Sequence, residues 1–210
     1  MADLKIGKIT LGVCATNCYF IYEQDKNKAI VVDPADDGAY IYSALKDRGF
    51  EICAILLTHG HFDHIWGCSE LRKLTGAKVY ALKEEEDLLL SADLNVSAQV
   101  RRPCTVKANT LVSDGDELTI EGMTFKVIAT PGHTKGSCCF YFEEEKMLIS
   151  GDTLFEESVG RTDLPTGSMS VLNKSIKEKL ALLPDDVTVY PGHGNRTTIE
   201  HEKNYNPFWG

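Results

Sequence analysis

The sequence has no long apolar run, which limits what kind of protein it can be. No stretch approaches the roughly 20 consecutive apolar residues that a membrane-spanning helix needs. The first ten residues also lack a charged segment followed by an apolar one, so they do not resemble a secretory signal. We therefore expect a protein that neither spans a membrane nor is exported.

Basic residues are in the minority, with 22 Lys and Arg against 31 Asp and Glu and a formal net charge of −9. An acidic chain is a poor general binder of nucleic-acid phosphates or anionic lipid, because like charges repel. We accordingly expect neither nucleic acid nor a membrane among the partners. The sequence leaves the oligomeric state open.

Cys-x-x-Cys pairs are absent, although the chain has seven cysteines. An odd count without a secretory signal favours reduced thiols and a cytoplasmic location. We expect these side chains to serve mainly as small buried apolar groups.

Linkers and low-complexity segments are also missing, so we expect one domain covering residues 1–210. Strands are predicted at Lys5–Leu11, Asn17–Tyr22, Ala29–Val32, Cys53–Leu57, Lys78–Leu82, Glu117–Ile120, Thr124–Ile128, Ser137–Phe142, Met147–Ser150 and Val187–Tyr190. Helices are predicted at Asp37–Arg48, Ile65–Leu74, Glu84–Leu90, Ser168–Leu183 and Glu200–Tyr205. Ser91–Lys107 shows no period and is interpreted as a surface excursion or a lid. Alternation of strands and helices in both halves predicts an α/β domain with two sheet layers covered by helices.

Histidine is scarce, and five of the six histidines lie in glycine-containing turns that follow predicted strands. The sixth, His201, lies in a charged segment and is expected at the surface. The turns are Thr58-His59-Gly60-His61-Phe62-Asp63-His64, Thr130-Pro131-Gly132-His133, Gly151-Asp152-Thr153 and Tyr190-Pro191-Gly192-His193-Gly194. Because strand ends present side chains to a common site, we expect these five histidines and two aspartates to converge.

Imidazole and carboxylate groups are ligands that suit Zn²⁺ and also iron or manganese. Seven of them are too many for one tetrahedral ion, but they suit two ions that share a carboxylate. Two such ions about 3.5–4 Å apart can hold a water and a substrate oxygen, and can lower the pKa of the bound water to about 7. We therefore expect two divalent metal ions, with zinc favoured over iron or manganese, and a hydrolase that uses a metal-bridging hydroxide.

These motifs resemble those of the metallo-β-lactamase superfamily and, within it, the glyoxalase II-like hydrolases. The resemblance runs from about Ile6 to His193 and implies a four-layer αββα sandwich with the site at one edge of the two sheets. It implies a first metal held by His59, His61 and His133, a second held by Asp63, His64 and His193, and Asp152 as the bridge. Asp33-Pro34 resembles an early aspartate of the family that supports the metal loops.

The same resemblance implies hydrolysis of a small-molecule thioester or ester, with Asp63 and Asp152 in catalytic roles. Arg161 falls where glyoxalase II-type enzymes carry a basic residue that contacts the thiol carrier. Its alternative role is an ion pair with Asp163 or bonds to loop carbonyls. Asn195 replaces a tyrosine of the larger enzymes, and their C-terminal helical domain is missing, so the match is with short single-domain members.

Other functions of the superfamily give the alternatives. Zinc-dependent β-lactamases commonly carry Cys where this chain has Asp152, which argues against antibiotic hydrolysis. The run Gly160-Arg161-Thr162-Asp163 is also typical of persulfide dioxygenases, which use one iron and consume O₂. A non-catalytic metal or redox module is the remaining alternative, and metal content separates the three.

Overall fold

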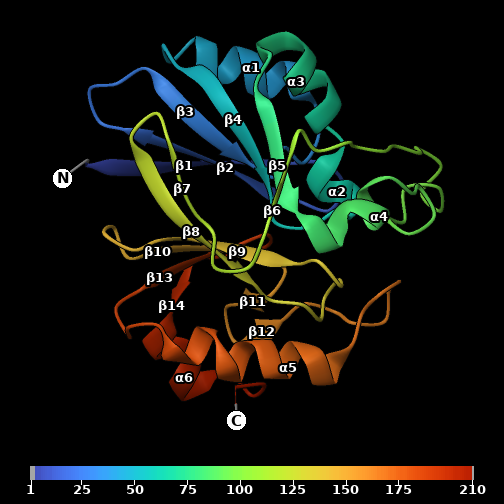
Figure 1. Ribbon diagram of the computed structural model, residues 1–210, viewed down its shortest axis with the longest axis vertical. Coiled ribbons are helices and arrows are strands. Elements are labelled where there is room, and N and C mark those ends of the chain that lie inside the picture. Colours follow the sequence, from blue (N-terminus) through green and yellow to red (C-terminus); the bar gives the residue numbers. More distant parts are fainter. Residues whose placement is uncertain (1–2, 210) are drawn as a thin grey trace.

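Two six-stranded β-sheets face each other in the computed structural model, which describes residues 3–209 (Figure 1). The first sheet follows chain order, with β1 to β3 antiparallel and β3 to β6 parallel. Its strands are β1 (Leu4–Leu11), β2 (Thr16–Glu23), β3 (Lys28–Val32), β4 (Glu51–Leu57), β5 (Lys78–Leu82) and β6 (Thr110–Val112).

The second sheet is mainly antiparallel and has the order β14-β13-β10-β9-β8-β7, with only β10 and β13 parallel. Its strands are β7 (Glu117–Ile120), β8 (Met123–Ala129), β9 (Cys138–Phe142), β10 (Met147–Gly151), β13 (Thr188–Pro191) and β14 (Thr197–Thr198). A separate hairpin, β11 (Leu154–Phe155) with β12 (Ser158–Val159), follows β10.

Helices cover the outer face of each sheet, which confirms the predicted αββα sandwich (Figure 1). The first sheet is flanked by α1 (Gly38–Lys46), α2 (Phe62–Ile65), α3 (Cys68–Thr75), the short 3₁₀ helix η1 (Lys83–Glu85) and α4 (Glu86–Leu89). The second is flanked by α5 (Met169–Glu178), η2 (Leu180–Leu182) and α6 (Ile199–Tyr205). Among residues 3–209, each helix is too short or too polar to cross a membrane.

The inner strands, such as β2, β3, β9 and β10, are buried on both faces, because each sheet lies between its partner sheet and a helical layer. In β2, Tyr19 and Ile21 point into the apolar layer between the sheets, while Cys18 and Phe20 point toward the helices. This alternation follows from the two-residue period of a strand. It explains why the β2 sequence reads as a nearly continuous apolar run.

Two predicted helices are interrupted, each where the chain meets another segment. The helix expected at Ile65–Leu74 is divided by Gly67, whose N–H donates to the Pro34 carbonyl at 2.9 Å. A Cβ at Gly67 would lie 2.7 Å from that oxygen, so only glycine fits there. The helix expected at Ser168–Leu183 ends at Glu178, and Lys179 leaves helical geometry and donates to the Ala129 carbonyl at 2.7 Å.

The segment 91–107 contains turns without regular structure, and two of its main-chain carbonyls bond to α2 and to Trp66, the residue that follows it. The Asn95 carbonyl accepts the Phe62 N–H at 3.1 Å, and the Arg102 carbonyl accepts the Trp66 indole N–H at 3.0 Å. Asn95 is fully buried. The segment therefore supports the short helix that carries Asp63 and His64.

Candidate metal centre

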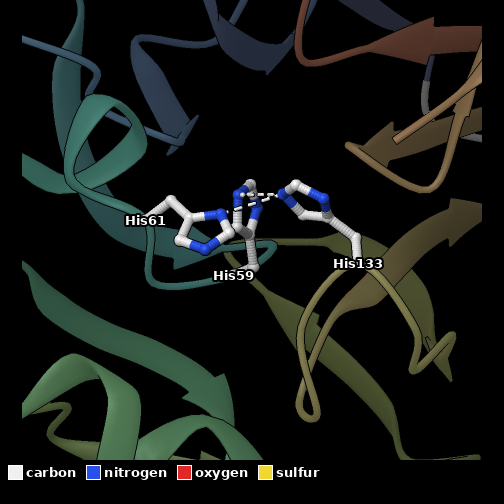
Figure 2. A group of neighbouring side chains, drawn as sticks. All are labelled: His59, His61 and His133. Atoms are coloured by element: carbon white, nitrogen blue, oxygen red, sulfur yellow. Dashed lines mark hydrogen bonds between the residues drawn. The ribbon is translucent and has the colours of Figure 1, made fainter. Parts of the chain in front are cut away.

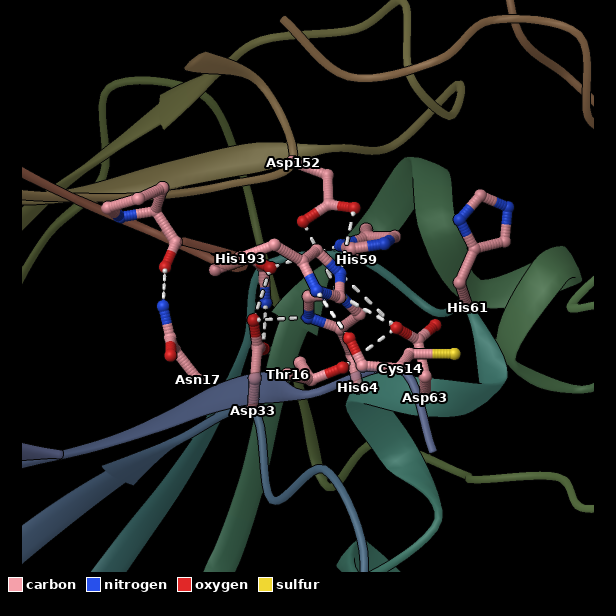
Figure 3. Close-up of polar contacts among 12 residues, drawn as sticks. Cys14, Thr16, Asn17, Asp33, His59, His61, Asp63, His64, Asp152 and His193 are labelled. Atoms are coloured by element: carbon pink, nitrogen blue, oxygen red, sulfur yellow. Dashed lines mark hydrogen bonds and ion pairs between the residues drawn. The ribbon is translucent and has the colours of Figure 1, made fainter. Parts of the chain in front are cut away.

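The seven side chains predicted to bind metal lie together at one edge of the sandwich, as Figure 3 shows for most of them. The turn after β4 supplies His59, His61, Asp63 and His64 from the first sheet. The turns after β8, β10 and β13 supply His133, Asp152 and His193 from the second. The strand ends therefore bring together motifs that are more than 130 residues apart in the sequence.

Three buried histidines form the first group, shown in Figure 2. His61 Nδ1 lies 2.9 Å from His133 Nε2, which lies 3.2 Å from His59 Nε2. Ligand nitrogens about 2.0–2.1 Å from one tetrahedral ion are about 3.4 Å apart, close to this spacing. The group therefore has the spacing to hold one ion.

Asp63, His64 and His193 form the second group. Asp63 Oδ2 lies 3.3 Å from His193 Nε2 and 3.6 Å from His64 Nε2. The Thr16 hydroxyl donates to the same oxygen at 2.8 Å and fixes the carboxylate. One carboxylate and two imidazoles form a set that suits a borderline divalent ion.

Asp152 lies between the two groups and contacts both. Its Oδ1 is 3.4 Å from His64 Nε2, whereas its Oδ2 is 3.5 Å from His193 Nε2 and 3.6 Å from His133 Nε2. One carboxylate thus faces the histidines of both groups.

Several polar atoms of the centre are buried without a hydrogen-bond partner, namely His61 Nε2, His64 Nε2 and Asp152 Oδ1. A buried polar atom without a partner costs about 1–3 kcal/mol, and such atoms are rare in native proteins. Two of these, on His64 and Asp152, face each other across the centre. A cation bound between these two atoms would satisfy both, so the residues present fit a metal centre.

Asp33 supports the centre from behind. Its Oδ2 lies 2.9 Å from His64 Nδ1, and its two oxygens accept the Thr58 N–H at 2.8 Å and the Thr58 hydroxyl at 2.6 Å. Asp33, His59 and His64 lie close enough to form a third candidate group. However, Asp33 contacts the ring nitrogen of His64 that faces away from Asp152, which fits the predicted supporting role.

Main-chain carbonyls orient two further imidazoles. The Arg161 carbonyl lies 2.6 Å from His133 Nδ1, and the Cys14 carbonyl lies 3.1 Å from His193 Nδ1. Because carbonyls only accept hydrogen bonds, each Nδ1 carries a proton and each Nε2 faces the centre. The Arg161 main chain therefore orients His133, a member of the first group.

The guanidinium of Arg161 makes a bidentate ion pair with Asp163, with both N–H···O distances 2.7 Å. This is the second of the two roles that the sequence leaves open for Arg161. Both side chains are exposed, and Arg161 lines the mouth of the pocket described below.

Burial and charge divide the imidazoles into two kinds. Burial lowers the pKa values of His59, His61 and His133, that of His61 to about 3, so these rings are neutral. For His193, burial also acts to lower the pKa, but hydrogen bonds to Asp152 and Asp63 outweigh it and raise the pKa to about 9. The first group is therefore ready to bind a cation, whereas the second holds protons that a cation would displace.

A pocket of about 410 Å³ opens over both groups. Its walls carry apolar side chains, including Phe62, Phe155, Val159 and Leu164. The exposed Cys14 lies at its edge, and the other described cysteines are buried or half-buried free thiols. His201 lies outside the centre, half-exposed and 3.0 Å from Glu157.

Sequence reasoning missed several polar residues that hold the loops in place. The Asn17 side chain donates to the carbonyls of Pro191 and Gly194, both at 3.0 Å, and ties β2 to the His193 turn. Thr16 bonds Asp63, and Glu85 bonds two main-chain N–H groups of the metal loops. A single polar residue at a strand start or in a short helix gives no pattern in the sequence that reveals such a contact.

An αββα sandwich with a histidine and aspartate cluster at its strand ends is the arrangement of the metallo-hydrolases. Residues 11–193 match the family model described as "Metallo-beta-lactamase superfamily". The chain therefore belongs to the metallo-β-lactamase superfamily.

Comparison with relatives agrees with this assignment. A "probable metallo-hydrolase" of Bacillus subtilis is 37% identical over 207 residues, covering 98% of this chain and 97% of that protein. A "hydroxyacylglutathione hydrolase" of Haemophilus influenzae is 33% identical over 198 residues, covering 91% and 92%. The hydrolase names of these relatives support a metal-dependent hydrolase.

Two solved structures are also similar. The crystal structure of the BLEG-1 B3 metallo-beta-lactamase is 39% identical with a TM-score of 0.93, covering 98% of this chain and 99% of that one. The structure of TTHA1623 in a di-iron-bound form is 32% identical with a TM-score of 0.85, covering 96% and 99%. The second shows that a similar fold can hold iron.

Proposed function

We propose that the protein is a two-metal hydrolase of thioesters or related esters. In this proposal His59, His61 and His133 hold one ion, Asp63, His64 and His193 hold the other, and Asp152 is shared. The observation that carries it is the position of Asp152, whose two oxygens lie 3.4–3.6 Å from histidines of both groups. A carboxylate that faces two adjacent ligand sets is suited to bridge two ions.

When bound, two such ions supply a water of lowered pKa and polarise a substrate carbonyl. The residues of the chain supply orientation and proton handling. Thr16 and the two histidine contacts all involve Asp63 Oδ2, which leaves Asp63 Oδ1 free to accept a hydrogen bond from the attacking water and hold its proton.

A thioester of a small thiol carrier is the substrate class that we favour. The similarity to a hydroxyacylglutathione hydrolase over nearly the whole chain supports it. Arg161 would bind a carboxylate of the carrier, exchanging Asp163 for the ligand, since its guanidinium is exposed at the pocket mouth.

Zinc is the proposed metal, because three neutral imidazoles and a carboxylate match its preferences, although a similar structure holds iron. We also propose that residues 1–210 act as one domain, since the centre draws ligands from both sheets. A cytoplasmic location agrees with the free thiols of all seven cysteines.

β-Lactam hydrolysis is the second candidate, favoured by the similarity to a B3 metallo-beta-lactamase. The same ligand groups could serve it, because an amide carbonyl is attacked in the same manner as a thioester. Asp152 in place of the cysteine found in many zinc β-lactamases does not by itself separate the two reactions.

Metal content and three assays test the proposal together. Freshly purified protein is examined by elemental analysis, then assayed for hydrolysis of a 2-hydroxyacyl glutathione thioester, hydrolysis of a chromogenic cephalosporin, and persulfide-dependent O₂ uptake. Two metals per chain with thioester turnover is the expected result. Cephalosporin turnover without thioester turnover would favour the second candidate. One iron per chain with O₂ uptake would overturn both in favour of a dioxygenase.

A further inference from the structure

Glu85 is a buried carboxylate that belongs to neither ligand group. It is the last residue of η1, the short helix that directly follows β5, and only 1% of its surface is exposed. Among residues 3–209, no Lys or Arg nitrogen lies within 4 Å of it. Burying a carboxylate without a cation is unfavourable, so hydrogen bonds from its partners must offset the free energy of the lost hydration.

Those partners are two main-chain N–H groups from the metal loops. Glu85 Oε1 accepts the N–H of Gly60 at 2.8 Å, and Oε2 accepts the N–H of Gly136 at 2.8 Å. Gly60 lies between His59 and His61, and Gly136 lies three residues after His133. One carboxylate therefore holds both loops that supply the first histidine group.

The two loops come from opposite sheets, and one main-chain hydrogen bond, from the Cys138 N–H to the Thr58 carbonyl at 2.9 Å, joins the strand ends beside them. Glu85 adds a second link, which acts on the loops themselves. The His59 and His61 loop follows β4 in the first sheet, and the His133 loop follows β8 in the second. The span between the two oxygens of Glu85 is fixed by covalent geometry. A bond to each loop at once therefore limits how far apart the loops can lie.

The main chain packs tightly around Glu85. A Cβ at Gly136 would lie 2.3 Å from the Glu85 nitrogen and 2.6 Å from the Glu84 carbonyl carbon. A Cβ at Gly60 would lie 2.7 Å from the Leu88 side chain. Both loops thus approach the segment of η1 and α4 as closely as glycine allows.

Charge strengthens this contact. Hydrogen bonds to an ionised carboxylate are roughly twice as strong as those between neutral groups. Burial raises the pKa of Glu85 to about 7, while the Gly60 N–H, the Thr134 hydroxyl, the Gly136 N–H and the charge of Lys135 act against that rise. The stronger, charge-assisted form of the contact is therefore reached above about pH 7. A glutamine would avoid the cost of burying a charge, but its amide nitrogen cannot accept the second N–H.

We propose that Glu85 is a positioning residue that fixes the spacing of His59, His61 and His133 and so sets the affinity of the first metal site. The inference rests on the proposed function for the presence of the ions. It adds a residue outside the ligand set that determines how well one of the two sites binds.

The test compares Glu85→Gln with Glu86→Gln, the same change at the next residue, which makes no side-chain hydrogen bond in the described structure. Zn²⁺ binding is measured by chelator competition on the metal-free proteins, which resolves a tighter and a weaker ion, and elemental analysis gives the total metal bound per chain. We expect Glu85→Gln to weaken one of the two Zn²⁺ ions by about 10–100-fold, the usual effect of losing an outer-sphere partner. The other ion and the Glu86→Gln protein should match the wild type within a factor of about two.

The melting temperature of the metal-free proteins separates positioning from simple stabilisation. If Glu85 only stabilises the fold, Glu85→Gln lowers that temperature and leaves both Zn²⁺ affinities unchanged, which overturns the inference. Glu85→Asp, which keeps the charge but is one methylene shorter, decides the matter if Glu85→Gln does not fold, because its affinity for one ion should also fall. Failure of the wild type to bind two ions would instead refute the proposed function.

Discussion

Asp152 is the residue at which the two candidate metal sites meet, because its carboxylate faces histidines of both groups. Each oxygen faces different histidines, and Oδ1 has no hydrogen-bond partner in the described structure. The nearby imidazoles keep this buried carboxylate ionised, holding its pKa well below the usual value against the opposing effect of burial. We therefore expect both the charge and the position of Asp152 to be needed for metal binding.

We predict that Asp152→Asn loses most bound metal and most hydrolysis. The change removes the charge and replaces one ligand oxygen with an NH₂ group that repels cations. Activity should fall by more than the roughly 10–100-fold that loss of an outer-sphere partner costs. Asp25→Asn, at an exposed turn position where φ is +71°, is the control. A fully loaded and active Asp152→Asn protein would contradict the scheme.

The residues of the centre differ in how visible they are in the sequence. His-x-His-x-Asp-His and the later histidine turns repeat a recognisable pattern after strands, so these side chains could be named in advance. Glu85 could not, because it lies in a run of three glutamates where exposed charge is the usual expectation. Only the packing of the Gly60 and Gly136 loops shows that this one is buried.

At the scale of elements, α5 fixes the turn that carries His133. The Ser175 hydroxyl donates to the Pro131 carbonyl at 2.7 Å, and the Ser168 N–H donates to the Gly132 carbonyl at 2.8 Å. Gly132 has φ of +138°, and a Cβ there would lie 2.3 Å from Leu172 Cα. The helix and the turn therefore form one packed unit.

Ser175→Ala should lower the free energy of unfolding by about 1 kcal/mol relative to Ser170→Ala. Both changes replace serine by alanine in the same helix, but Ser170 is exposed and its hydroxyl contacts the Ser168 hydroxyl at 3.2 Å. Only the first leaves the Pro131 carbonyl without its donor. Urea unfolding of both proteins without metal measures the difference. Equal stabilities would mean that the bond to Pro131 contributes nothing.

Element boundaries were predictable where a local signal exists and were missed where the cause is distant. The helix at Asp37–Arg48 was expected, and α1 begins at Gly38, with Asp37 accepting the Tyr40 N–H. The break at Gly67 depends on the Pro34 carbonyl, more than 30 residues earlier. The short strands β6 and β14 form only because longer neighbouring strands offer free edges.

For the whole molecule, the charged groups of the centre predict how stability depends on pH without metal. The pKa of His193 is raised to about 9, so its contribution is complete below the unfolded value near 6.5 and is lost as the pH rises through about 9. The pKa of His61 is lowered to about 3, so its contribution is complete above about 6.5 and is lost as the pH falls toward 3.

We therefore expect the melting temperature of the metal-free protein to peak near pH 6.5 and to fall on both sides, by roughly 2–4 °C for each kcal/mol lost. The zinc-loaded protein should not show the alkaline fall, because metal replaces the proton on His193. Thermal unfolding between pH 5 and 9.5, with and without Zn²⁺, checks this. A metal-free melting temperature that rises steadily to pH 9 would contradict the assignment of charges.

The sequence alone determined the fold class and the identities of the clustered residues. Both depend on local patterns, namely strand periodicity and glycine turns that follow strands. It also indicated hydrolase chemistry, through the kind and number of ligands.

The tertiary structure decided what depends on distance. It showed that Asp152 faces both groups, that the Arg161 guanidinium pairs with Asp163, and that Glu85 joins loops from opposite sheets. Each of these depends on how the two sheets pack against each other. No local pattern in the chain encodes that geometry, because the contacting segments meet only after the sandwich has closed.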